Sequence, residues 1–274
     1  MPRLAAPDQV IHKVIHRNGD QLFGARAFPG PRRLGLSPIW GIDRGIVVPD
    51  NFPHRMCSHY QALKEQDKYR KYFGVEPPID PSKWDLWPGY LGAFIRRHPH
   101  ADVGDEAVPG CEALTGLFGL VPHWSQDTKI DRHTFNARSE TVADKPSFRD
   151  AWKRAQHCII PADSIFEPDW RSGKSVATQI VRADGEPLGI AGLWSSWKSP
   201  QGEMVHSYTM LTVNANEHPL MRLLHKPPDE KRMVVILPSD RYQDWLAAPA
   251  EHSTEFLRLF ADDGLQTLLP ASTA

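Results

Sequence analysis

Hydrophobic and polar positions follow no sustained period over residues 1–56, and they become regular only from Ser58 onward. The early segment is interrupted by Pro29-Gly30-Pro31 and by Val48-Pro49-Asp50, which are turn and loop signals. A pattern of this kind is typical of loop or disorder rather than of a packed element. We therefore expect residues 1–56 to be a disordered extension outside the folded domain.

From Ser58 on, the pattern predicts short strands separated by turns, with helices grouped between them. Helical spacing covers Gln61–Phe73, Ser147–Ala155, Ser239–Ala247 and Thr254–Phe260, and Ser147 with Asp150 resembles a capping box. The strand-like runs are Leu91–Arg96, Leu114–Val121, His157–Ile160, Val176–Val181, Leu188–Trp194, Tyr208–Val213 and Met233–Leu237. Because helices and strands do not strictly alternate, the sequence predicts an α+β fold.

Composition places the 274-residue chain among ordinary globular proteins, with 24% charged and 41% hydrophobic residues. No run of 18 apolar residues exists, so no membrane helix is expected, and the first residues lack the apolar core of a secretory signal. Cys57, Cys111 and Cys158 lie far apart, which excludes a disulfide scaffold and a paired-cysteine zinc site. We expect a cytoplasmic protein.

The net charge of −1 is a cancellation between two parts of the chain. Residues 1–56 carry eight basic and four acidic residues, a net of +4, and contain no glutamate. The remaining residues carry 24 basic and 29 acidic residues, a net of −5. Total charge therefore neither favours nor excludes a nucleic-acid partner, and any such recognition must come from a local basic cluster.

Five motifs occur in order along the second part of the chain, and they carry the candidate chemistry. They are Met56-Cys57-Ser58-His59-Tyr60; Gly119-Leu120-Val121-Pro122-His123-Trp124; Phe135-Asn136-Ala137-Arg138-Ser139-Glu140-Thr141; Cys158-Ile159-Ile160-Pro161-Ala162-Asp163-Ser164-Ile165-Phe166-Glu167; and Thr212-Val213-Asn214-Ala215-Asn216, followed by His225 and Arg232-Met233-Val234-Val235-Ile236-Leu237. This series resembles the SOS response-associated peptidase (SRAP) family of abasic-site processing proteins over residues 56–274. The resemblance implies one domain over 57–274, with a mainly antiparallel, barrel-like β core, peripheral helices and a DNA-binding cleft.

In that family the working cysteine follows the initiator methionine and becomes the N-terminus, which makes Cys57 the matching residue. An N-terminal cysteine has an α-amine, with an ordinary pKa of about 7.7–8.0, close to its thiol. The amine can form a Schiff base with the aldehyde of an opened abasic sugar, and the thiol can then close a thiazolidine ring. Residues 1–56 must then be non-native upstream sequence or be removed. The alternative is that Cys57 is an ordinary buried thiol.

The resemblance implies catalytic roles for Asn136, Glu167 and His225 beside Cys57. The Asn136 amide would orient the cysteine or its sugar adduct, while Glu167 and His225 would transfer protons. The apolar neighbours of Glu167 are expected to raise the pKa of its carboxyl, and Asp169 is an alternative carboxylate.

The resemblance also implies DNA contacts at six positions. Arg138 would bind a backbone phosphate and Trp124 would stack on a base. Lys145, Arg149, Thr212 and His59 are further candidates. The alternatives are a solvent-facing arginine for Arg138, a core tryptophan for Trp124, and a solvated helix face for Lys145 and Arg149.

The leading hypothesis is covalent capture of abasic sites in single-stranded DNA during the response to DNA damage, with autoproteolytic peptidase activity and lyase character as further features. It requires no metal and no organic cofactor, and we expect a monomer with no membrane partner, associated with the nucleoid when DNA is damaged. One rival is a cysteine peptidase or amidase that uses the Cys57 thiolate with His225. Another is a non-covalent module that binds single-stranded or modified-base DNA.

Overall fold

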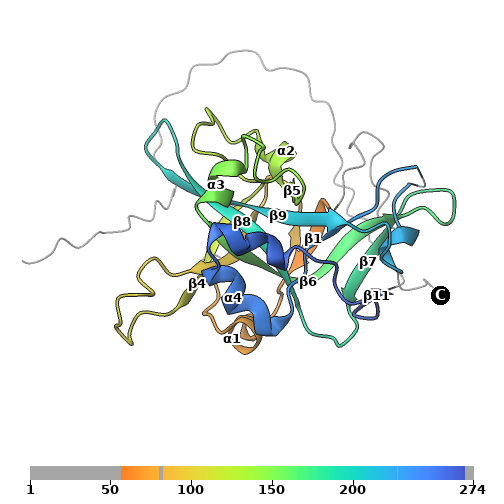
Figure 1. Ribbon diagram of the computed structural model, residues 1–274, viewed down its shortest axis with the longest axis horizontal. Helices are drawn as coiled ribbons and strands as arrows, with labels where there is room; N and C mark the ends of the chain where they lie inside the picture. The colour runs from red at the N-terminus through yellow and green to blue at the C-terminus, as the bar shows by residue number, and fades with distance from the viewer. Residues whose placement is uncertain (1–56, 80–82, 227, 269–274) are drawn as a thin grey trace, which may run out of the picture. The chain divides into compact units, whose positions relative to one another are not determined.

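The computed structural model describes residues 57–79, 83–226 and 228–268 (Figure 1). The expectation of a disordered, non-native or removed extension over residues 1–56 lies outside these residues. In the described part, the strands are β1 (His59–Ala62), β2 (Asp85–Leu86), β3 (Leu91–Arg97), β4 (Cys111–Phe118), β5 (Asn136–Arg138), β6 (His157–Asp169), β7 (Val176–Arg182), β8 (Leu188–Lys198), β9 (Met204–Asn214), β10 (Arg232–Val234) and β11 (Leu265–Leu268). The helices are α1 (Asp67–Phe73), α2 (Asp131–Thr134), α3 (Arg149–Lys153) and α4 (Tyr242–Ala247), and the 3-10 helices are η1 (Met221–Leu223), η2 (Ser239–Arg241) and η3 (Ala250–Phe256).

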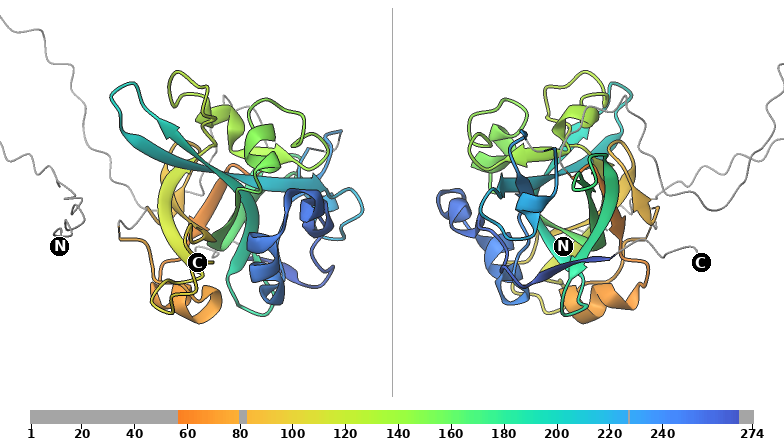
Figure 2. Two further views of the ribbon diagram at one scale, coloured as in Figure 1. Left: turned by 60° about the vertical axis from the view of Figure 1, so that its left-hand side comes forward. Right: turned by 90° about the vertical axis from the view of Figure 1, so that its right-hand side faces the viewer.

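Five strands close into a barrel, which can be followed in Figures 1 and 2. β9 pairs with β8 and β4, β4 with β3, β3 with β6, and β6 with β8, which completes the ring. Only the β4–β9 contact in this ring is parallel. The remaining strands extend the sheet, with β1 and β7 on β6 and with β5 and β10 on β9. The predicted α+β class with a mainly antiparallel, barrel-like core and peripheral helices is confirmed.

Aromatic side chains fill part of the barrel interior. Tyr60, Phe94, Phe118 and Tyr208 have no exposed surface. The rings of Phe118 and Tyr208 stack with centroids 5.5 Å apart, and the hydroxyls of Tyr60 and Tyr208 are 2.5 Å apart. A Cβ atom on Gly92 of β3 would lie 2.1 Å from the Tyr208 hydroxyl and 2.6 Å from that of Tyr60. The tyrosine pair therefore requires glycine at this position of the strand.

A second apolar cluster lies between the sheet and α1, α3 and α4, and α4 is drawn in blue in Figure 2. Trp245 of α4 is fully buried, its indole N–H donates to the Cys158 carbonyl of β6 at 2.8 Å, and its ring stacks on His157. Cys158 itself is fully buried. Within the part of the chain that the structure describes, the two apolar clusters draw on residues from Cys57 to Leu265.

Most predicted strands are present with longer bounds, and three helix predictions need correction. Gln61 belongs to β1 and pairs with Ser164 of β6, so the helix predicted from Gln61 begins only at Asp67. α3 begins after Phe148 with no side-chain cap, so the Ser147–Asp150 capping box is wrong. The last predicted helix is the 3-10 helix η3, which ends at Phe256.

Candidate functional site

Cys57 lies beside Glu167 because β1 pairs with the end of β6. The register places His59 opposite Phe166, which brings the residues just before β1 next to Glu167. The backbone N–H of Cys57 donates to Glu167 Oε2 over 3.3 Å, and both residues are buried, with 2% and 1% of their surface exposed. Cys57 has a φ of +33°, a left-handed backbone that L residues rarely adopt and that often occurs at functional sites.

Asn136 approaches Cys57 from a different part of the barrel. It begins β5, which runs parallel to β9 with Asn136 opposite Met210. Its side-chain Nδ2 donates to the Cys57 carbonyl oxygen at 3.4 Å. Strand pairing alone therefore brings the second predicted site residue to the first, across 79 positions of sequence.

His225 completes the group from the segment that follows η1. Leu224 forms an isolated bridge with Asp169, and the His225 N–H donates to the Pro168 carbonyl at 2.7 Å. This places His225 Nε2 at 3.4 Å from Glu167 Oε2, the same oxygen that the Cys57 N–H contacts. The four residues predicted as catalytic therefore lie together.

The electrostatics of this group follow from its burial. Burial raises the pKa of the Glu167 carboxyl, although His225 and the Cys57 N–H act in the opposite direction. Burial and the adjacent Glu167 carboxylate also raise the pKa of the Cys57 thiol well above its ordinary value. Among the described residues, Glu167 Oε1 is buried and has no hydrogen-bond partner. The site is therefore suited to proton transfer by a carboxyl group and poorly suited to a free thiolate.

Asp169, the alternative carboxylate, has a different partner. Its carboxylate binds the Arg171 guanidinium at 2.6 Å, and this contact lowers the pKa of Asp169. Glu167 is the carboxyl group that faces Cys57.

The surface residues predicted to contact DNA are Trp124, Arg138, Lys145 and Arg149, and all four are exposed. The Trp124 side chain is 47% exposed and its indole N–H donates to the Pro146 carbonyl at 3.3 Å, so it is not a core tryptophan. Arg138 extends from β5 and forms an ion pair with Glu230 at 2.9 Å. These residues offer cations and one aromatic face to solvent.

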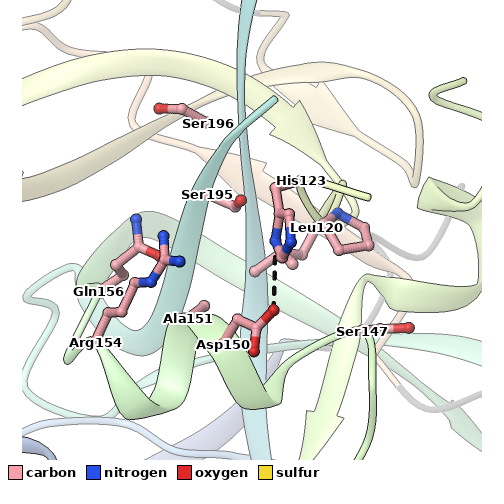
Figure 3. Close-up of a pocket in the computed structure, with 10 residues that line it drawn as sticks. Leu120, His123, Ser147, Asp150, Ala151, Arg154, Gln156, Ser195 and Ser196 are labelled. Atoms are coloured by element: carbon pink, nitrogen blue, oxygen red, sulfur yellow. Dashed lines mark ion pairs between the residues drawn. The ribbon is translucent and has the colours of Figure 1, made fainter. Parts of the chain in front are cut away.

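Figure 3 shows a small polar pocket whose lining includes Pro122 and His123, the two residues before Trp124 in the sequence. Its volume is about 130 Å³, and His123 and Asp150 face each other in it with 3.3 Å between Nδ1 and Oδ2. Ser147, Arg154 and Gln156 add polar groups to its wall.

Two other predicted DNA contacts are buried instead. The Thr212 side chain is 1% exposed, and its hydroxyl accepts a hydrogen bond from Arg232 at 3.3 Å. His59 is 5% exposed, stacks between Trp87 and Phe166 at 4.1 Å from each ring, and lies 2.6 Å from Asp85. The structure does not place either side chain where a DNA strand would reach it.

Arg232 is a structural residue for which sequence reasoning gave no role. It is fully buried, and its guanidinium binds both oxygens of Glu140, at 3.1 and 2.8 Å, and Glu230 at 2.7 Å. Its Nη2 also donates to the Thr212 carbonyl. Both Arg232 and Glu140 stand inside the quoted motifs, so their place in those motifs was the available signal. Their ion pair joins β10 to the turn that follows Arg138.

Among the residues that the structure describes, no group of three or more His, Cys, Asp or Glu side chains could hold a metal ion. No helix in the same residues is both long and apolar enough to cross a membrane.

The fold and the site together define a class of protein: a mixed β-barrel in which a buried carboxyl group faces the backbone nitrogen of a cysteine just before a strand. The family model described as SOS response associated peptidase (SRAP) matches residues 56–269. The chain belongs to this family, as its motifs indicated.

Several relatives carry informative names. The chain is 36% identical over 194 residues to the Abasic site processing protein YoqW of Bacillus subtilis, covering 70% of this chain and 80% of that protein. It is 27% identical to the Abasic site processing protein HMCES of Gallus gallus, covering 74% of this chain and 65% of the relative.

Solved structures share the fold. A protein from Bordetella bronchiseptica has a TM-score of 0.69 and 50% identity, with 77% of this chain matching 98% of that one. A protein from Bacteroides thetaiotaomicron, with a TM-score of 0.65 and 20% identity, shows the same fold.

Proposed function

We propose that the protein captures abasic sites in single-stranded DNA by forming a thiazolidine with Cys57 as its N-terminal residue. The observation that carries this proposal is that the Cys57 backbone nitrogen faces the buried Glu167 carboxyl at 3.3 Å. In a chain that begins at Cys57, this nitrogen is the α-amine, and Glu167 and His225 lie where its protons must be exchanged. The names of the relatives, which are abasic site processing proteins, support the substrate.

The chemistry balances without a cofactor. The amine adds to the C1′ aldehyde of the opened sugar, and the resulting carbinolamine loses one water to give an imine. The Cys57 sulfur then adds to the imine carbon, and the thiol proton ends on the nitrogen. The raised pKa of Glu167 favours its protonated form, which can donate a proton to the departing oxygen.

The proposal includes the domain organisation. The functional form begins at Cys57, and residues 1–56 are either non-native upstream sequence or removed. The start of the family match at residue 56 supports this boundary, and residues 57–274 then act as one domain. While a peptide bond joins Met56 to Cys57, the nitrogen is an amide and cannot form an imine.

DNA binding in this proposal uses the four exposed residues described above. Trp124 stacks on a base, a contact worth about 1–3 kcal/mol, and Arg138, Lys145 and Arg149 bind phosphates. The side-chain amide of Asn136 orients Cys57 by donating a hydrogen bond to the backbone carbonyl of Cys57.

The peptidase rival needs a Cys57 thiolate, and the raised pKa of this thiol makes that form scarce. The non-covalent rival needs no reaction at Cys57.

One experiment separates the three hypotheses: protein beginning at Cys57 is incubated with single-stranded DNA that carries one abasic site, and heat-stable adducts are counted. We expect an adduct with this protein and none with Cys57→Ala or with the full-length chain.

An adduct that forms equally with the protein that begins at Cys57, with Cys57→Ala and with the full-length chain would contradict the thiazolidine mechanism. A protein that binds the same DNA without any adduct would favour the non-covalent module. Cleavage of an added peptide by the full-length chain, lost in Cys57→Ala, would favour the peptidase. Intact-mass analysis of the protein from its native host tests the boundary at Cys57.

A further inference from the structure

The backbone of His225 has an unusual conformation that something must stabilise. Its φ is +64°, in the left-handed region, although it is not a glycine. The conformation matters because it directs the imidazole toward Glu167, with Nε2 at 3.4 Å from Oε2. On one side of His225, the N–H donates to the Pro168 carbonyl of β6 at 2.7 Å.

On the other side, Lys231 holds the His225 carbonyl. The ammonium group of Lys231 donates to the carbonyl oxygen of His225 at 3.3 Å and to that of Lys226 at 2.6 Å. Two successive peptide units after the left-handed turn are thereby bound to one cation. The backbone of Lys231 is fixed in turn, because its N–H donates to Asn216 Oδ1 and its carbonyl accepts from the Ala215 N–H, just before β10.

Stability alone does not explain this lysine. Lys231 is 9% exposed, and its two hydrogen bonds go to backbone carbonyls, while none of the ion pairs among the described residues includes it. Burying an ammonium group without a carboxylate is unfavourable. Its placement is better explained by the backbone shape that it maintains.

We propose that Lys231 is a positioning residue for the reaction at Cys57: it keeps His225 in its left-handed conformation and so keeps the imidazole against Glu167. Lys231 acts only through His225, because its ammonium contacts carbonyl groups of the 225–226 segment. The inference about the reaction rests on the proposed function.

The test compares Lys231→Met with Lys226→Met, both in protein that begins at Cys57. Lys226 is the matched control because its ammonium lies over the Trp170 ring at 5.8 Å, and its substitution leaves the backbone carbonyl in place. We expect Lys231→Met to lower the rate of adduct formation at saturating abasic DNA by about tenfold or more, part of what a proton-transfer group contributes. The Kd for that DNA stays within about twofold, and Lys226→Met changes neither value by more than about twofold.

A double-mutant cycle shows whether Lys231 works through His225. In the His225→Ala background, Lys231→Met should cause no additional loss of rate. A loss that persists there in full would indicate a general structural effect and would overturn the inference, as would a rate for Lys231→Met equal to that of Lys226→Met. Should Lys231→Met fail to fold, Lys231→Gln is measured in the same cycle.

A readout without DNA keeps the inference separate from the proposed function. In protein with isotope-labelled histidine, the NMR signal of the His225 ring is assigned by its loss in His225→Ala. We expect Lys231→Met to shift this signal, while Lys226→Met leaves it in place. An unchanged signal in Lys231→Met would overturn the positioning role, whereas a failure of the Lys226→Met protein and the parent protein to form adducts would overturn only the proposed function.

Discussion

The surroundings of the Glu167 side chain determine the pKa of its carboxyl group. One carboxylate oxygen contacts both the Cys57 N–H and His225, and the other is buried without a hydrogen-bond partner among the described residues. Burial raises the pKa of the carboxyl more than these two neighbours lower it. The carboxyl therefore keeps its proton to a higher pH than an exposed glutamate, which is the property required of a general acid.

This pKa shift predicts a pH-dependent loss of stability. Because the folded protein holds the Glu167 proton more tightly than the unfolded chain, the favourable contribution is complete below the ordinary pKa of 4.5 and is lost as the pH rises through the folded value. Glu167→Gln lacks this loss. We expect the melting temperature of Glu167→Gln, relative to that of the parent protein, to increase as the pH rises from about 4.5. The increase ends where the carboxyl in the folded parent protein is fully ionised.

The control for this measurement is Glu106→Gln, which removes an exposed carboxylate. A difference between Glu167→Gln and the parent protein that stays constant with pH, or that follows Glu106→Gln, would contradict the raised pKa.

Glu230 is a second residue whose partners carry a prediction. It binds the Arg138 guanidinium at 2.9 Å, so a DNA phosphate must compete with it for this cation. An exposed ion pair is worth about 0.2–1 kcal/mol. We expect Glu230→Gln to tighten binding of single-stranded DNA by up to about fivefold at low salt, with a smaller gain at high salt.

Asp229→Asn is the matched control, since it removes the same charge from the adjacent, exposed position. Titration of both variants with a fluorescent oligonucleotide measures the effect. Equal gains in the two variants would mean that net charge, and not release of Arg138, is responsible.

At the scale of elements, strand pairing determines what the local pattern leaves open. The longer strands were predictable because their apolar runs are bounded by turn signals. β1 was not, because it is only four residues long and its last two, Gln61 and Ala62, lie in a stretch with helical spacing. These residues form a strand through pairing with β2 and with β6, about a hundred residues further along. The motifs named the four residues that the structure brings together around Cys57, whereas nothing in the motifs indicated that Thr212 and His59 are buried, where they contact Arg232 and Asp85.

The barrel interior gives a prediction for strand β3. In Gly92→Ala, the new methyl group would overlap the hydroxyls of Tyr208 and Tyr60, so the strand or the tyrosine pair must shift. We expect a loss of about 1–3 kcal/mol in the free energy of unfolding, measured by urea denaturation. Gly110→Ala is the control, because a Cβ atom there meets no atom within 4 Å. Equal stabilities of the two variants would show that the close approach in the barrel is not constraining.

For the whole molecule, the charge balance is a poor guide to the partner. The net charge of −1 combines +4 from residues 1–56 with −5 from the rest. The three cations that we propose to bind phosphate, Arg138, Lys145 and Arg149, are exposed and belong to one short stretch from β5 to the start of α3. Recognition of a polyanion would therefore depend on where these cations lie and not on the total charge.

The two-sided pairing of β1 has a mechanical consequence for a protein joined to DNA at Cys57 as proposed. β1 is hydrogen-bonded along both edges, to β2 on one side and to β6 on the other. A pull directed along this strand would load the hydrogen bonds of both edges together in shear rather than open them one after another. A motor enzyme moving along the DNA would thus meet an obstacle attached next to a strand that is held along both of its edges.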